Sequence, residues 1–293
     1  MRKQKVSVFA YFYNQAPFVR ERLESILNQI DNIGEILIID DGSTDGTYLE
    51  LCLFLKSLPT STLQVIELKR FEKASGYAAG RWNLISRAKF NYVWIAEGDD
   101  ACTQNFLERS LSQLDANPLA DFSWTQSKLV DESNVFLGLD IQHHQLSHGT
   151  TFTSSPGSYG GLDFAKVEFS HYNPLPNVSS CVFRTEPLQQ ILTKYENKIT
   201  KAVIAADWLL YFHLIINGSV MVINEPLNIF RRRTNSVSQS LNKELHYWEF
   251  VSVQNYLSDI LNIDYSTDYD IINKIKIERE NLRLSLGLEL IGK

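Results

Sequence analysis

The chain has few of the features that would assign it to a secreted, a membrane or a nucleic-acid-binding class. It contains only three cysteines, Cys52, Cys102 and Cys181. Their odd number and wide separation exclude a disulfide framework and any metal-ligand spacing among them, and they favour a reducing compartment. The net charge of −6 excludes the basic surface that a nucleic-acid partner would require.

Long apolar runs are also missing from the sequence. No segment reaches the ~18 consecutive apolar residues of a membrane span, and the short basic N-terminus is not followed by the apolar region of a signal peptide. We therefore expect a cytoplasmic protein, with peripheral contact at the inner face of the cell membrane left open.

Apolar strands alternate with helices over the first 120 residues. The patterns predict strands at 5–13, 35–39, 63–68 and 92–96, and helices at about 18–30, 47–58 and 77–89. Near-continuous apolar strands separated by helices indicate a mainly parallel sheet covered on both faces. This part of the chain is typical of a Rossmann-like half-domain.

The pattern changes after residue 120. Strands are predicted at 122–130, 177–184 and 221–223, and helices at 186–195 and 206–216, whereas residues 138–176 read as a functional loop or irregular substructure. Two further helical stretches follow residue 241. We expect them to pack on the main domain, but dimerisation, membrane contact or a connection to another domain would also use their apolar faces.

A first acidic cluster directly follows the strand predicted at 35–39, and reads Asp-Asp-Gly-Ser-Thr-Asp-Gly-Thr over residues 40–47. Ligands of open α/β sheets bind beyond the carboxyl ends of the strands. A carboxylate placed there can accept hydrogen bonds from a nucleotide base or a ribose, and Gly42 allows close backbone approach. The alternative is a turn that caps the next helix, but capping requires only one such residue.

A second acidic cluster, Glu97-Gly98-Asp99-Asp100, follows the strand predicted at 92–96. In a parallel sheet it would lie at the same edge as Asp41. Adjacent carboxylates repel each other unless a cation or several donors neutralise them, and oxygen ligands of this kind suit Mg²⁺ or Mn²⁺. The alternative is an acidic N-terminal cap for a helix that begins near Asn105.

These segments together resemble the family-2 glycosyltransferases, which have a GT-A fold. The resemblance rests on four stretches in order: VSVFAYFYN, ILIIDDGSTDGT, GYAAGRWNLISRA and YVWIAEGDD. It continues through 177–184, 205–208 and 225–238, so that it spans about residues 5–240. It implies a mixed, mainly parallel Rossmann-like sheet flanked by helices. The implied parts are a nucleotide-sugar-binding half at 1–120, an acceptor-binding half at 121–240 and a helical C-terminal extension at 241–293.

The resemblance implies roles for particular residues on the donor side. Asp41 would hold the nucleotide base, and Tyr13 and Asn14 match the aromatic and polar positions beside the base. Contacts to the donor sugar or its diphosphate are implied for Arg81, Glu97 and Asp99. The metal motif falls on Asp99 and Asp100, with Asp100 the better ligand. Arg233 lies in a basic run, 231–233, that either binds the diphosphate or an anionic acceptor, or forms a solvated edge.

The same resemblance implies that Asp207 is the general base of an inverting transfer. It would take the proton of an acceptor hydroxyl as that oxygen attacks the anomeric carbon of the sugar. The chain departs from the family by having Ala206 before this base, where Glu is usual, and by having Tyr11 and Trp82 at positions normally occupied by other residues. These departures bear on the shape of the pockets.

The implied function is transfer of a sugar from a nucleotide-diphosphate donor to a glycan or lipid-linked glycan acceptor, in surface polysaccharide synthesis. Two alternatives share parts of the pattern. A sugar-nucleotide-forming nucleotidyltransferase should carry a Gly-rich phosphate loop after the first strand, where this chain reads Tyr-Asn-Gln-Ala-Pro over residues 13–17. A non-catalytic glycan-binding domain should have lost the carboxylates, but all of them are present.

Overall fold

The computed structural model describes residues 5–74, 82, 84–148, 150, 152–234 and 242–288. Their strands form one ten-stranded sheet in the order β3-β2-β1-β4-β9-β6-β10-β5, with β7 added to β6 and β8 added to β10. The strands are β1 (Val6–Phe12), β2 (Ile33–Asp40), β3 (Ile66–Arg70), β4 (Tyr92–Glu97), β5 (Ala101–Cys102), β6 (Phe122–Val130), β7 (Phe136–Leu139), β8 (Gly157–Gly160), β9 (Cys181–Arg184) and β10 (Ser219–Arg231).

The sheet is mixed and mainly parallel, as the sequence predicted. The strands β3, β2, β1 and β4 are parallel neighbours, and β10 runs parallel to β6. Between these two parallel groups lies β9, which is antiparallel to both β4 and β6. The sheet therefore continues across residue 120, and the division into a donor half and an acceptor half remains a prediction about function.

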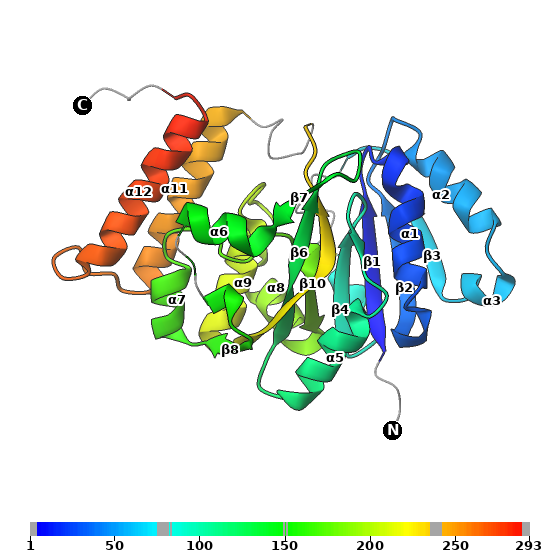
Figure 1. The fold of residues 1–293 in the computed structure, drawn as a ribbon, viewed down its shortest axis with the longest axis horizontal. Helices are drawn as coiled ribbons and strands as arrows, with labels where there is room; N and C mark the ends of the chain where they lie inside the picture. The colour runs from blue at the N-terminus through cyan, green and yellow to red at the C-terminus, as the bar shows by residue number, and fades with distance from the viewer. Residues whose placement is uncertain are drawn as a thin grey trace.

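Helices cover both faces of this sheet (Figure 1). They are α1 (Val19–Leu27), α2 (Thr47–Lys56), α3 (Thr60–Leu63), α5 (Phe106–Ala116), α6 (Asp140–His148), α7 (Leu162–Glu168), α8 (Thr185–Ile199), α9 (Ala206–Asn217), α11 (Lys243–Ile260) and α12 (Tyr269–Ser285). None of the helices among the described residues is both long and apolar enough to cross a bilayer.

The strand β1 shows how the sequence builds two cores. All seven of its side chains are buried. Because side chains alternate across a strand, Val8 and Phe12 join the hydrophobic cluster that includes α1, α2 and α5. Phe9 and Tyr11 point to the opposite cluster, which includes α8 and α9. A strand buried on both faces has to be apolar throughout, and for this reason the first half was readable from the sequence.

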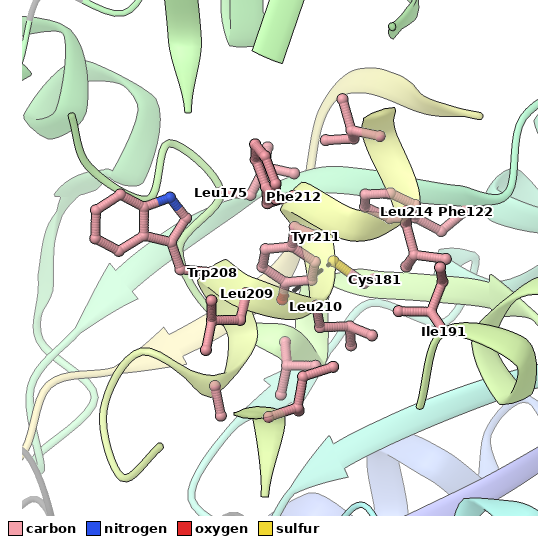
Figure 2. Packing of buried hydrophobic residues seen from close by; sticks show 14 of the residues in the cluster. Phe122, Leu175, Cys181, Ile191, Trp208, Leu209, Leu210, Tyr211, Phe212 and Leu214 are labelled. Atoms are coloured by element: carbon pink, nitrogen blue, oxygen red, sulfur yellow. Dashed lines mark hydrogen bonds between the residues drawn. The ribbon is translucent and has the colours of Figure 1, made fainter. Parts of the chain in front are cut away.

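The helix α9 crosses the second core. Figure 2 shows its side chains Trp208, Leu209, Tyr211 and Phe212 packed among residues from several other elements. Every residue from Trp208 to Ile215 is buried. A helix that is apolar on all sides is held by packing in every direction, so that the position of its first turn is fixed by the core.

The two C-terminal helices pack on the main domain, as expected. Figure 1 shows α11 and α12 side by side, in orange and red, at the end of the molecule opposite α2 and α3. Val253 and Leu257 of α11 and Ile275 of α12 belong to the same buried cluster as α9. The Phe250 ring lies 5.3 Å from that of Trp208, measured between centroids.

The helix predicted at 77–89 falls mostly on residues outside the described ones, and its last part contains the 3-10 turn Ile85–Arg87. Three other predictions of local structure were wrong. The strand predicted at 177–184 begins only at Cys181, after the 3-10 turn Val178–Ser180. The strand predicted at 221–223 is the 13-residue β10, whose pairing with β6 continues past register shifts on both sides of Pro226. Proline has no N–H to donate, so the sequence suggests an end where the strand only forms an irregularity. Residues 138–176, read as a loop or irregular segment, contain α6, α7 and β8.

The packing of α11 yields a stability prediction. Leu257 is fully buried, whereas Leu245 on the same helix is 65% exposed. We expect Leu257→Ala to lower the free energy of unfolding by about 2–5 kcal/mol, since it removes transfer energy and leaves a cavity. Leu245→Ala should change that free energy by less than about 0.5 kcal/mol. Urea denaturation of both variants measures this, and similar values for the two would contradict docking of α11 on the core.

Candidate active site

The two acidic clusters lie at one edge of the sheet. In the parallel register, Phe12 of β1 pairs with Asp40 of β2, and Tyr11 of β1 pairs with Glu97 of β4. The segments that follow these strands begin at the same level of the sheet. The structure therefore places the two clusters together, as the strand order predicted.

The loop after β1 is tied to the loop after β2 by side chains. The Asn14 N–H donates to Ser43 Oγ at 3.0 Å, and the Thr44 N–H donates to Asn14 Oδ1 at 2.8 Å. The Gln15 N–H donates to Thr47 Oγ1 at 2.8 Å. Asn14 takes a left-handed conformation, with φ of 51°. Its side-chain oxygen serves this tie, and contact of Asn14 with a donor stays a prediction.

The two adjacent aspartates after β2, Asp40 and Asp41, make different contacts. Asp40 is fully buried, and its Oδ2 lies 3.2 Å from Nε of Arg70. Asp41 is 2% exposed, and its N–H donates to Phe12 O. At Gly42 φ is +73°, and a Cβ would lie 2.7 Å from the backbone of Lys73 and Ala74. Glycine is therefore required beside Asp41, where the backbone of another segment approaches.

The second cluster is held by residues that precede β9. The Glu97 N–H donates to Ser179 Oγ at 3.0 Å, and Asn177 Nδ2 donates to Asp100 Oδ2 at 2.8 Å. Asp100 is 2% exposed. Burial, with the added repulsion of Asp99, raises the pKa of Asp100 to about 6. An ionised Asp100 therefore depends on the donors and cations that surround it.

Arg231, at the end of β10, is a buried cross-link behind this cluster. Its backbone N–H donates to Asp100 Oδ1 at 3.1 Å, and its Nε donates to Asp99 O at 2.8 Å. The remaining guanidinium nitrogens donate to Asp131 O, to Asn134 Oδ1 and to Glu21 Oε2. The Arg231 side chain is fully buried and engaged inside the protein, which excludes the surface role expected for the whole basic run 231–233.

Arg233 connects the two clusters. Its Nη1 lies 3.3 Å from Asp99 Oδ2, and its Nη2 donates to Asn14 O at 3.0 Å. The guanidinium also lies 5.5 Å from the centroid of the Phe18 ring. A cation beside an acidic edge can bind a diphosphate, and this role of Arg233 stays a prediction. Tyr13, on the same loop as Asn14, is 39% exposed.

Asp207 lies in the first turn of α9 and is half-buried. It is close to Cys181, the first residue of β9: burial raises the pKa of Cys181 to about 12, and the charge of Asp207 adds to this rise. Cys181 directly follows the 3-10 turn Val178–Ser180 that holds Glu97. The charge of Asp207 therefore acts on the start of β9, and its role as a base stays a prediction.

Arg81, predicted to contact the donor, lies outside the described residues. Its neighbour Trp82 is 3% exposed and borders a cavity of about 330 Å³. The opposite wall is formed by α8 and the residue that follows it, and the lining side chains are Trp82, Ser86, Gln189, Leu192, Thr193, Glu196 and Thr200. None of the predicted site residues that the structure describes lines this cavity.

The metal prediction has a partial geometric basis. Within the described part of the chain, no group of three or more His, Cys, Asp or Glu side chains converges as a complete metal site. Asp99 and Asp100 provide adjacent carboxylates, and Asp100 is buried with a raised pKa. Mg²⁺ commonly takes one or two protein carboxylates and completes its shell with water and substrate phosphates. The donor set therefore fits such an ion.

The sequence did not reveal two supports of the site. Asn177 stands at the start of a predicted strand, but in the structure its Oδ1 accepts from the Ser179 N–H at 2.7 Å and its Nδ2 donates to Asp100. An Asn side chain commonly accepts from the backbone N–H two residues later in a turn, so the Asn itself was a signal. The internal role of Arg231 depends on contacts up to 210 residues away, which no local pattern records.

Comparison with known proteins gives the same picture. The model of "Glycosyl transferase family 2" matches residues 7–155, just over half of the 293-residue chain. The putative teichuronic acid biosynthesis glycosyltransferase TuaG of Bacillus subtilis is 32% identical over 133 residues, which is 45% of this chain and 50% of the relative. The uncharacterized protein Rv1520 of Mycobacterium tuberculosis is 22% identical over 247 residues, 83% of this chain and 64% of the relative. The chain thus spans less than two-thirds of the length of either curated relative.

Two solved structures share the fold. The S. aureus TarS fragment 1–349 in complex with UDP-GlcNAc has a TM-score of 0.63 at 19% identity, covering 96% of this chain and 73% of TarS. The mannosyltransferase PcManGT from Pyrobaculum calidifontis, in complex with GDP-Man and Mn²⁺, has a TM-score of 0.57 at 12% identity, covering 100% of this chain and 77% of the other. At these identities the likeness concerns the fold.

The role of Arg231 can be tested by unfolding. Arg231→Met should lower the free energy of unfolding by about 2–4 kcal/mol, because several buried acceptors lose their donor. The control is Arg20→Met, since the Arg20 side chain is 68% exposed in its pair with Glu24. That pair should contribute less than about 0.5 kcal/mol. Chemical denaturation of both variants measures the difference, and equal losses would contradict the internal role of Arg231.

Proposed function

This chain belongs to glycosyl transferase family 2, and on that premise we propose that it transfers one sugar from a nucleotide-diphosphate donor to a hydroxyl group of a glycan or lipid-linked glycan. The observation that carries the proposal is the convergence of both acidic clusters at the carboxyl edge of β1, β2 and β4. The donor complexes named for the two solved structures, UDP-GlcNAc and GDP-Man with Mn²⁺, support a nucleotide sugar as the ligand.

The donor would lie across this edge. Asp41, buried beside Gly42, would accept hydrogen bonds from the nucleoside, and the exposed ring of Tyr13 would stack on the base. The diphosphate would meet Arg233 and, in the sequence-based expectation, Arg81. Glu97 is the residue proposed to contact the donor sugar. A divalent cation, Mg²⁺ or Mn²⁺, held by Asp99 and Asp100 would stabilise the negative charge of the departing diphosphate.

Asp207 is the proposed general base. The acceptor oxygen forms a bond to the anomeric carbon as the bond from that carbon to the diphosphate oxygen breaks. The acceptor proton passes to the Asp207 carboxylate, and the nucleoside diphosphate leaves with the electron pair of the broken bond. Attack opposite the leaving group inverts the anomeric configuration. The base acts only if its oxygen lies within hydrogen-bond reach of the acceptor hydroxyl.

The biological setting we propose is synthesis of a surface polysaccharide. The relative from Bacillus subtilis is named for teichuronic acid biosynthesis, which supports a polymeric acceptor. A nucleotidyltransferase is less well supported, because the loop after β1 is tied down by side chains of the next loop and has no Gly-rich sequence. A non-catalytic glycan-binding domain would have no need for the buried Asp100.

Isosteric variants separate binding from turnover. We expect Asp100→Asn to abolish metal-dependent donor binding, measured as the thermal shift produced by UDP-GlcNAc or GDP-Man with Mn²⁺. Asp207→Asn should keep that thermal shift but lower turnover by about 10²- to 10⁴-fold, because only proton transfer is lost. EDTA should reproduce the loss of donor binding in the parent protein. Release of nucleoside diphosphate in the presence of oligosaccharide acceptors measures turnover.

The control is Asp163→Asn, an exposed carboxylate on α7 that should retain parent binding and turnover. Parent-like turnover in Asp207→Asn would reject this base. If a panel of nucleotide sugars and acceptors gives no turnover while one donor binds, the glycan-binding alternative is favoured. Formation of a sugar nucleotide from a nucleoside triphosphate and a sugar 1-phosphate would instead identify a nucleotidyltransferase.

A further inference from the structure

One side chain of the C-terminal extension, Glu249 of α11, binds the backbone that directly precedes the helix carrying Asp207. Its Oε1 accepts three successive backbone N–H groups, from Val203 at 3.0 Å, Ile204 at 2.7 Å and Ala205 at 2.8 Å. Its Oε2 shares the Val203 N–H at 3.1 Å. One carboxylate thus accepts hydrogen bonds from three consecutive backbone N–H groups that lie about 45 residues earlier in the chain.

These amides belong to the connection between α8 and α9. Ala205 is the N-cap residue of α9, and no side-chain hydrogen bond caps that helix from its own N-cap position. Neither Ala205 nor Ala206 has a polar side chain. Successive N–H groups that precede a helix form a positively polarised concavity, which an anion fills favourably. Glu249 is that anion, supplied by another helix.

The contact is rigid on both of its sides. Trp208, three residues after Ala205, is 2% exposed and packs against Phe250, the residue next to Glu249 on α11. Val253 and Leu257 anchor the same helix in the core. The first turn of α9, which contains Asp207, is therefore fixed on one side by the buried remainder of the helix. On the other side, the Glu249 carboxylate binds the backbone that precedes this turn.

We infer that Glu249 is a positioning residue for Asp207, an inference that rests on the proposed function. It acts through the backbone of residues 203–205, and it fixes where the first turn of α9 places the Asp207 carboxylate. Effective proton transfer demands alignment so close that a misplacement of about 1 Å can cost 10²-fold in rate. The proposed donor contacts lie on other segments, after β1, β2, β4 and β10 and, for Arg81, before β4. Loss of Glu249 should therefore reduce kcat without a matching change in the donor KM.

The test uses a graded series in the full-length chain. Glu249→Gln keeps one carbonyl oxygen but replaces the other oxygen by an amide donor that faces the Val203 N–H, whereas Glu249→Ala removes the whole contact. We expect kcat to fall about 10-fold in the first variant and about 10²-fold in the second, with the donor KM within about twofold of the parent value. Glu244→Gln, an exposed carboxylate on the same helix, is the matched control and should retain parent kinetics.

Two further measurements separate positioning from general damage. In the double variant Glu249→Ala/Asp207→Asn, turnover should match that of Asp207→Asn alone, because a base that is absent cannot be misplaced. Binding of UDP with Mn²⁺, measured by calorimetry, should be the same in Glu249→Ala as in the parent. Additive losses in the double variant, or equal losses of binding and turnover, would overturn the inference.

Hydrogen exchange tests the contact independently of catalysis. The amides of residues 203–205 should exchange faster in Glu249→Ala than in the parent, whereas those of 209–215 should be unchanged. If the parent protein transfers no sugar, the proposed function fails, and the exchange result alone then decides whether Glu249 holds this segment. Unchanged exchange at 203–205, or parent kcat in Glu249→Ala, would refute the role of Glu249.

Discussion

Burial of the Asp100 carboxylate is the constraint around which the active-site edge is arranged. A carboxylate removed from water is costly unless donors and opposite charge surround it. Its partners here are Asn177 Nδ2, the backbone N–H of Arg231 and, at longer range, the Arg22 guanidinium. These three residues come from α1, from the turn before β9 and from the end of β10. The acidic cluster therefore takes its geometry only once the whole sheet has assembled.

Arg22 is a buried cation next to the same acidic cluster. It is fully buried, its guanidinium lies 4.8 Å from the ring of Trp94, and its nitrogens have no hydrogen-bond partner among the described atoms. Burial lowers the pKa of Arg22, and the acidic groups around it, Cys102 and Asp100 foremost, oppose that change. The positive charge under the acidic edge is thus stabilised by the edge itself. The acidic cluster and the buried Arg22 guanidinium therefore stabilise each other's charge.

The antiparallel strand β9 explains how distant segments reach this edge. Because β9 runs against β4, with Val182 opposite Trp94, the beginning of β9 lies toward the carboxyl end of β4. The turn before β9 is thereby carried to Glu97 and Asp100, which its Ser179 and Asn177 contact. Periodicity and turn signals predicted the parallel half and the shared edge correctly, since strands buried on both faces must be apolar. They did not predict Asn177 or Glu249 as partners, because these contacts join a side chain to a group 45 to 77 residues away.

The two sides of the site are held by different means. On the donor side, hydrogen bonds of short polar side chains join neighbouring loops, as between Asn14 and Thr44. On the side of Asp207, the helix α9 is almost wholly apolar, and its N-cap residue, Ala205, has no polar side chain with which to cap the helix. The backbone N–H groups of residues 203–205, which lead into the helix, donate to Glu249 of α11. The C-terminal helices therefore cover apolar surface and also hold the backbone that precedes α9. The backbone that leads into this core helix is held by a carboxylate of another helix, and the first turn of the helix carries Asp207, the residue proposed to remove the acceptor proton.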